Sequence, residues 1–95
     1  MDHSPPPTKV VVVHAPACHF CEEAHSVLAD LAGEFPIEVR SVEATDPEGE
    51  ALFRRWRAPM YPLVLVDGTF FSFGRLPRNK LRALLAARYP AEARS

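Results

Sequence analysis

Ninety-five residues is the length of a single domain, and a hydrophobic content of 47% is sufficient for a packed core. Twelve acidic and eleven basic residues give a net charge of -1, so the composition gives no basis for binding nucleic acid or an anionic membrane. No apolar run approaches the roughly 20 residues of a membrane-spanning helix, and MDHSPPPT at the amino terminus lacks the basic-then-apolar order of a secretory signal. Two cysteines do not make a disulfide-stapled secreted scaffold, so we expect a cytoplasmic protein.

The first half of the chain predicts a strand, a helix and a second strand. Residues 1–8 contain three consecutive prolines and predict a disordered lead-in to a domain spanning 9–88. The four valines at 10–13 predict a strand buried on both faces. An apolar stripe from Ala24 to Leu31 predicts a helix over 18–33, and IEVRSV at 37–42 predicts a more peripheral, half-buried strand. A crossover of this length makes the two strands parallel.

The second half predicts a helix, a hairpin and a final helix. Asp46 and Pro47 are a typical N-cap and first position for a helix that ends before Pro59. Asp67-Gly68 joins two apolar runs within 63–73, which is a strong signal for an antiparallel hairpin. A helix follows over 77–88, and 89–95 predicts a frayed tail. The order β-α-β-α-β-β-α predicts an α/β domain with a four-stranded mixed sheet and helices on both faces.

The stretch HAPACHFCEE, residues 14–23, contains both cysteines of the chain. Cys18 is predicted at the amino terminus of a helix, where unpaired N–H groups and the helix dipole favour an anion and lower a thiol pKa from ~8.5 into the range ~3.5–7.5. Cys21, in the first turn, is close enough to attack a mixed disulfide formed on Cys18, and we expect it to be the more buried thiol. A redox pair, half of a metal site and a passive disulfide are the three interpretations that this pattern allows.

The metal interpretation rests on five Cys and His residues within twelve positions, namely His14, Cys18, His19, Cys21 and His25. A structural zinc site usually needs four ligands from two separated segments, and no second Cys or His cluster follows. Glu22 follows Cys21, which excludes a Cys-x-x-Cys-His haem attachment site. We therefore expect no bound metal or cofactor.

The order of elements and the HAPACHFC stretch resemble the thioredoxin-like superfamily, and within it the glutaredoxin-like branch. Pro16, Cys18 and Cys21 match the glutaredoxin pattern Lys-Pro-x-Cys-Pro-Tyr-Cys, and Pro62 stands where the family keeps a cis proline before its third strand. The resemblance covers roughly residues 9–88. It implies a thiol–disulfide oxidoreductase in which Phe20, Tyr61 and Pro62 contact the substrate.

The departures from the family concern the partner more than the reaction. Ala15 replaces the lysine that helps hold glutathione, and only Gly74 of the Gly-Gly-x-Asp-Asp segment is kept. We therefore expect a protein or small-molecule disulfide substrate and a reductant that the sequence does not identify, with the chain acting as a monomer. The alternative is a thioredoxin-fold binding module that bridges an iron–sulfur cluster or docks a partner through the same surface.

Three other features carry weaker expectations. His19, between the cysteines, is expected to tune the redox potential by stabilising the Cys18 thiolate, unless its side chain simply points into water. Trp56 follows helical spacing and is predicted in the core. The basic cluster Arg54, Arg55 and Arg57 is typical of a solvated face, with docking of an acidic partner as the alternative.

Overall fold

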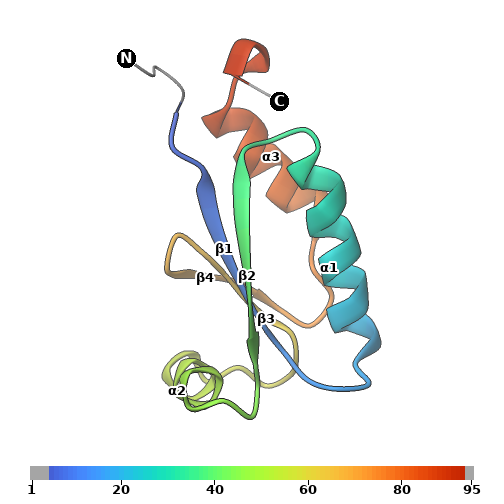
Figure 1. The fold of residues 1–95 in the computed structure, drawn as a ribbon, viewed down its shortest axis with the longest axis vertical. Helices are drawn as coiled ribbons and strands as arrows, with labels where there is room; N and C mark the ends of the chain where they lie inside the picture. Colours follow the sequence, from blue (N-terminus) through green and yellow to red (C-terminus); the bar gives the residue numbers. More distant parts are fainter. Residues whose placement is uncertain (1–4, 94–95) are drawn as a thin grey trace.

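The computed structural model describes residues 5–93 of the chain (Figure 1). Its elements are β1 (Thr8–His14), α1 (His19–Ala32), β2 (Ile37–Glu43), α2 (Pro47–Trp56), β3 (Leu63–Val66), β4 (Thr69–Phe73), α3 (Arg78–Arg88) and a terminal 3₁₀ turn, η1 (Ala91–Ala93). The predicted α/β class and the order of the seven main elements are confirmed. Among the described residues, no helix is long and apolar enough to span a bilayer.

The sheet has the strand order β2-β1-β3-β4. β1 is parallel to β2 and antiparallel to β3, and β3 and β4 form the predicted hairpin. Asp67 and Gly68 have φ angles of 50° and 80°, the left-handed pair that a tight two-residue turn between twisted strands requires. The sheet is therefore mixed, as the sequence predicts.

Two cores lie on opposite faces of this sheet. Val10 and Val12 of β1 pack against the predicted stripe of α1 and against α3, while Val13 packs on the other face with residues of β3 and α2. Figure 1 shows α1 and α3 on one side of the sheet and α2 alone on the other. Four consecutive valines are typical of a strand that helices cover on both faces. β1 therefore lies where its sequence predicts, in the middle of the sheet.

β2 is an edge strand and more exposed than its alternating sequence indicates. Val42 is its one fully buried residue, and Val39 is 40% exposed. Because only one neighbour pairs with β2 and α2 is short, the outer strand receives little cover on either face.

α2 begins where Asp46 and Pro47 predict, although the Asp46 side chain makes no capping hydrogen bond. The start of this helix presses on the end of β2. A Cβ atom added to the buried Gly49 would lie 2.1 Å from the carbonyl oxygen of Glu43. Gly49 is thus the residue that lets α2 approach the sheet.

Both predicted domain boundaries fall inside packed structure. Thr8 belongs to β1 and is 1% exposed, and Tyr89 is 3% exposed. The Tyr89 hydroxyl lies 2.8 Å from Thr8 Oγ1 and donates to the carbonyl oxygen of Pro6 at 2.7 Å. The ordered domain therefore extends beyond 9–88 at each end, because two residues of opposite predicted tails satisfy each other's hydroxyl groups. Positions 1–4 and 94–95 of those tails lie outside the described residues.

Candidate functional site

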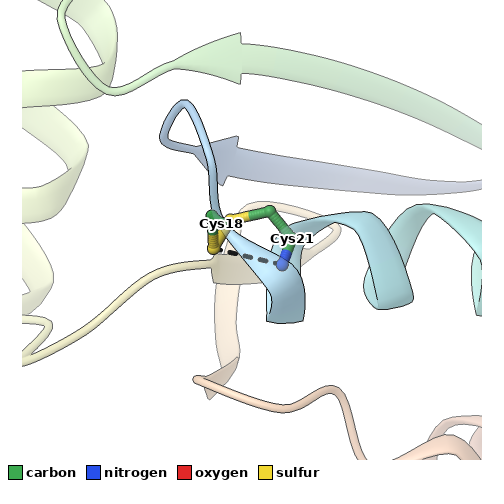
Figure 2. Close-up of a disulfide and its surroundings, with 2 residues drawn as sticks. All are labelled: Cys18 and Cys21. Carbon is green, nitrogen blue, oxygen red and sulfur yellow. Dashed lines mark hydrogen bonds between the residues drawn. A yellow bond between two sulfur atoms is a disulfide. The ribbon is translucent and has the colours of Figure 1, made fainter.

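Cys18 lies between the end of β1 and the start of α1. β1 ends at His14, and Ala17 then adopts a left-handed conformation with φ 53°. This sharp turn brings Cys18 into an extended conformation as the N-cap of α1, whose first helical residue is His19. Figure 2 shows Cys18 in this loop and Cys21 within the first turn of the helix.

Cys18 and Cys21 are joined in a disulfide, with Cα atoms 5.2 Å apart. Cys18 is partly exposed and Cys21 is 3% exposed. The expectation that the second cysteine is the more buried is confirmed, because Cys21 points from the helix toward the core while Cys18 stands at its open end. The two cysteines therefore differ in their access to solvent.

Cys18 also caps the helix. Its Sγ accepts a hydrogen bond from the backbone N–H of Cys21 at 3.2 Å, drawn as a dashed line in Figure 2. Its carbonyl oxygen accepts from the N–H of Glu22 at 3.1 Å. The positive end of a fourteen-residue helix thus points at Sγ, which favours a thiolate over a neutral thiol there once the disulfide is reduced.

Pro62 is buried and follows Tyr61 through a cis peptide bond. The antiparallel register sets Leu63 opposite Val13, so Pro62 lies beside the end of β1 where the loop toward Cys18 begins. The Tyr61 ring stacks on Phe53 with centroids 4.2 Å apart. The Pro62 carbonyl accepts a hydrogen bond from Gly74 N–H at 3.0 Å, which ties this loop to the end of β4.

Phe20, the other predicted contact residue, is partly buried in the first turn of α1. The guanidinium carbon of Arg75 lies 5.2 Å from the centre of the Phe20 ring, and Arg75 Nε forms a 3.0 Å ion pair with Glu23 Oε1. Sequence reasoning missed Arg75, since no local pattern predicts that a residue after β4 reaches the first turn of α1. His19 is exposed, so its expected influence on the redox potential stays a prediction.

The histidines of the metal interpretation are divided between two places. His14 and His25 contact each other edge to face with centroids 5.5 Å apart, and His25 Nε2 lies 2.9 Å from Ser41 Oγ. Within residues 5–93, no three His, Cys, Asp or Glu side chains gather in a way suited to hold a metal ion. The two thiols that would contribute to such a set are bonded to each other.

Comparison with known proteins identifies the fold. No protein-family model and no curated protein matches the chain. Among solved structures, a mutant thioredoxin from Halobacterium salinarum NRC-1 superposes with a TM-score of 0.62 at 19% identity, covering 86% of this chain and 74% of that one. The fold is thioredoxin-like. An uncharacterised thioredoxin-like protein from Clostridium perfringens agrees, with a TM-score of 0.61 at 13% identity over 90% of this chain and 73% of that one.

Together, the thioredoxin-like fold and the Cys-x-x-Cys pair suggest a redox function. The fold sets the pair at the start of the helix that follows the central strand, and the sequence supplies two sulfurs with unequal access to solvent. What this arrangement allows chemically is reversible disulfide exchange, in which the outer sulfur meets a substrate and the inner one completes the reaction.

Proposed function

We propose that this chain is a thiol–disulfide oxidoreductase that works through the Cys18–Cys21 couple. The observation that carries the proposal is the disulfide across the first turn of α1, with one cysteine partly exposed at the N-cap and the other buried. A passive structural disulfide would span distant segments, whereas this one links residues only three positions apart and closes a short loop with little entropy to remove.

The first step uses the exposed sulfur. With the couple reduced, the Cys18 thiolate attacks one sulfur of a substrate disulfide. A bond forms between Cys18 Sγ and that sulfur, the substrate S–S bond breaks, and the departing substrate thiolate takes the electron pair and then a proton from water. The helix dipole of α1 stabilises the attacking anion.

The second step uses the buried sulfur. Cys21 loses its thiol proton and attacks Cys18 Sγ, so that the Cys18–Cys21 bond forms and the second substrate thiolate leaves. The substrate disulfide has then gained two electrons and two protons, and the protein has become the disulfide seen in the structure. A dithiol donor reverses the same two steps to restore the reduced protein.

The neighbouring residues supply a surface for the substrate. Pro62 is fully buried and its carbonyl is bonded to Gly74, so its cis peptide bond shapes the loop that holds Tyr61 near the end of β1, where the loop to Cys18 begins. Tyr61 and Phe20 add aromatic surface around it. We assign Phe20 and Tyr61 to substrate contact. The buried Pro62, expected from the sequence to contact the substrate, is assigned to positioning Tyr61, and His19 to tuning the stability of the Cys18 thiolate. The reaction fits a reducing compartment such as the cytoplasm, where a disulfide of this kind is transient.

The proposal is tested by insulin reduction in the presence of dithiothreitol. We expect the wild-type protein to accelerate the reaction and Cys18→Ser to fall to the uncatalysed background, because the remaining thiol, Cys21, is buried and cannot meet the substrate. In a separate incubation of pre-reduced protein with insulin and no dithiothreitol, Cys21→Ser should accumulate a covalent Cys18–substrate adduct detectable by mass spectrometry, since the resolving thiol is absent. Undiminished turnover by Cys18→Ser would contradict the proposal.

Titration of the couple in redox buffers identifies the physiological direction. A potential near −270 mV is that of a thioredoxin-like reductant, about −200 to −230 mV that of glutaredoxins, and about −120 mV that of a strong oxidant. The absorption spectrum of the purified protein separates the alternative, because an iron–sulfur cluster bridged between chains would colour the protein and protect Cys18 from alkylation.

A further inference from the structure

The described arginines fall into two groups. Five of them form ion pairs with carboxylates elsewhere in the fold, namely Arg40, Arg75, Arg78, Arg82 and Arg88. The structure records no ion pair for the remaining three described arginines, Arg54, Arg55 and Arg57, which are exposed and consecutive at the end of α2 except for Trp56. Glu50, one turn earlier on the same helix, is the nearest acidic residue in the sequence.

The exposed hydrophobic residues concentrate in the same region. Among the described residues, four large hydrophobic side chains are exposed, and three of them are Met60 (42%), Phe70 (37%) and Phe73 (45%). Trp56, predicted in the core, packs only partly against it and carries Arg55 on its ring, with the guanidinium carbon 5.3 Å from the ring centre.

These residues form one continuous surface. Trp56 and Phe70 have ring centroids 6.3 Å apart, and Phe70 and Phe73 have centroids 5.8 Å apart. Phe73 is followed in the chain by Gly74, and Met60 packs against Gly74 so closely that an added Cβ would lie 3.0 Å from Met60 Sδ. Arg55 contacts this surface through the Trp56 ring, and Arg54 and Arg57 flank these two residues at the same end of α2. We call the whole region the arginine–aromatic surface, and it comprises Arg54, Arg55, Trp56, Arg57, Met60, Phe70 and Phe73.

The arginine–aromatic surface lies next to the cis-proline loop, which flanks the end of β1. Gly74 N–H donates to the Pro62 carbonyl, so the Met60 end of the surface adjoins the cis-proline loop. The loop that leads into the helix carrying the arginines is joined to the end of β1 by a 2.8 Å hydrogen bond from Ala44 N–H to the His14 carbonyl. Figure 1 accordingly shows α2 at the end of the sheet from which the loop to α1 departs.

We propose that the arginine–aromatic surface docks an acidic segment of a protein substrate whose disulfide is delivered to Cys18. Tryptophan, phenylalanine, methionine and arginine are the residue types enriched at protein interfaces, and an exposed apolar patch with a charged rim marks an interaction site. The three arginines select carboxylates, because each offers several N–H donors and none is recorded in an ion pair within the described chain. The proposal rests on the proposed function and names its substrate class.

The test compares two synthetic peptides of equal length that contain the same internal disulfide. One has Asp and Glu flanking a leucine, and the other has Lys in place of the acids. In single-turnover reduction by the pre-reduced protein, we expect the acidic peptide to react about tenfold faster at low salt, with the ratio falling below about twofold at high salt as the charges are screened.

A pair of triple variants assigns the preference to the surface. Arg54→Gln, Arg55→Gln and Arg57→Gln together should reduce the tenfold ratio to below about twofold. The control, Arg78→Gln, Lys80→Gln and Arg82→Gln on α3, lowers the net charge by the same amount and should keep the ratio. Circular dichroism checks that both variants fold. A small neutral disulfide, bis(2-hydroxyethyl) disulfide, should react equally with all three proteins because it does not reach the surface.

Three results overturn the proposal while leaving the function intact. These are equal rates for the two peptides, equal loss in the two triple variants, and a wild-type dimer in sedimentation that the α2 variant abolishes, which would assign the surface to a second copy. Failure of the wild-type protein to reduce even the small disulfide would instead refute the proposed function.

Discussion

Asp67 shows how one side chain serves both a turn and an ion pair. Its carboxylate accepts the backbone N–H of Lys9 at 3.0 Å and pairs with Arg88. The hydrogen bond from the Lys9 N–H, followed in size of effect by the one from the Arg88 guanidinium, holds the pKa of the Asp67 carboxyl below its ordinary value. The charged form is therefore more favourable in the folded state than in the unfolded chain.

Asp67→Asn isolates the charge, because asparagine tolerates the left-handed conformation of the turn and keeps an acceptor oxygen for Lys9. A lowered folded-state pKa gives stability that is present above the unfolded value of about 3.9 and is lost as pH falls through the folded value. We expect the variant to lose less than about 1 kcal/mol at pH 7, since the Asp67 side chain is 43% exposed.

Urea unfolding of both proteins from pH 7 to pH 2 measures this difference. The gap between wild type and Asp67→Asn should close as pH drops below about 4. A gap that is constant over the whole range would mean that the charge of Asp67 contributes nothing to folding.

At the residue scale, the sequence predicted the cysteines better than their surroundings. Local spacing was sufficient to place Cys18 at a helix start and Cys21 behind it, because both positions are set within one turn. Arg75 stacked on Phe20 and Met60 packed on Gly74 depend on contacts between segments far apart in the chain. The periodicity of hydrophobic residues along the sequence gives no information on such contacts.

The second helix depends on one glycine at its start. We expect Gly49→Ala to lower the free energy of unfolding by about 1–3 kcal/mol, because the new methyl group would collide with the Glu43 carbonyl and push α2 from the sheet. Chemical denaturation measures the loss.

Gly33→Ala is the matched control for that substitution. Gly33 caps α1 with φ −73°, a conformation open to any residue, and an added Cβ would lie 3.4 Å from the nearest atom, the Asp30 carbonyl oxygen. It should be neutral or stabilise by up to about 1 kcal/mol through the unfolded chain. Equal losses in the two alanine variants would show that close packing at Gly49 is not the cause.

At the element scale, helices and strands with strong local signals were predicted accurately. The Asp67-Gly68 hairpin and the α1 stripe are examples, because turn conformation and helical spacing are local properties. Burial of β2 was overestimated, since its cover depends on the length of α2 and on its position at the sheet edge.

At the scale of the whole molecule, the two ends of the domain meet at Tyr89, beside a second hydrogen bond from Arg88 to Thr8 Oγ1. Tyr89 connects α3 to Thr8 of β1 and to Pro6, more than eighty positions away in sequence. No sequence pattern predicts this link, because a tyrosine after a helix and a threonine after three prolines each resemble the start of a loose tail.

Tyr89→Phe should therefore lower stability by about 1–2 kcal/mol, because the ring stays buried while the Thr8 hydroxyl and the Pro6 carbonyl lose a partner. For a domain of this size, that corresponds to a fall in Tm of several degrees per kcal/mol, measured by thermal circular dichroism. Unchanged Tm would show that the hydroxyl is dispensable and that the ring alone closes the domain.

The central position of β1 has a consequence during synthesis. Among the described strands, β1 is synthesised before its partners, and β3, one of the two, begins about fifty residues later, at Leu63. At ~5–20 residues per second, a run of four valines stays without its neighbour for several seconds. Such a β-prone, uncharged stretch favours association between nascent chains. Lys9 directly before it and the histidine directly after it are the polar residues that oppose this association from either side.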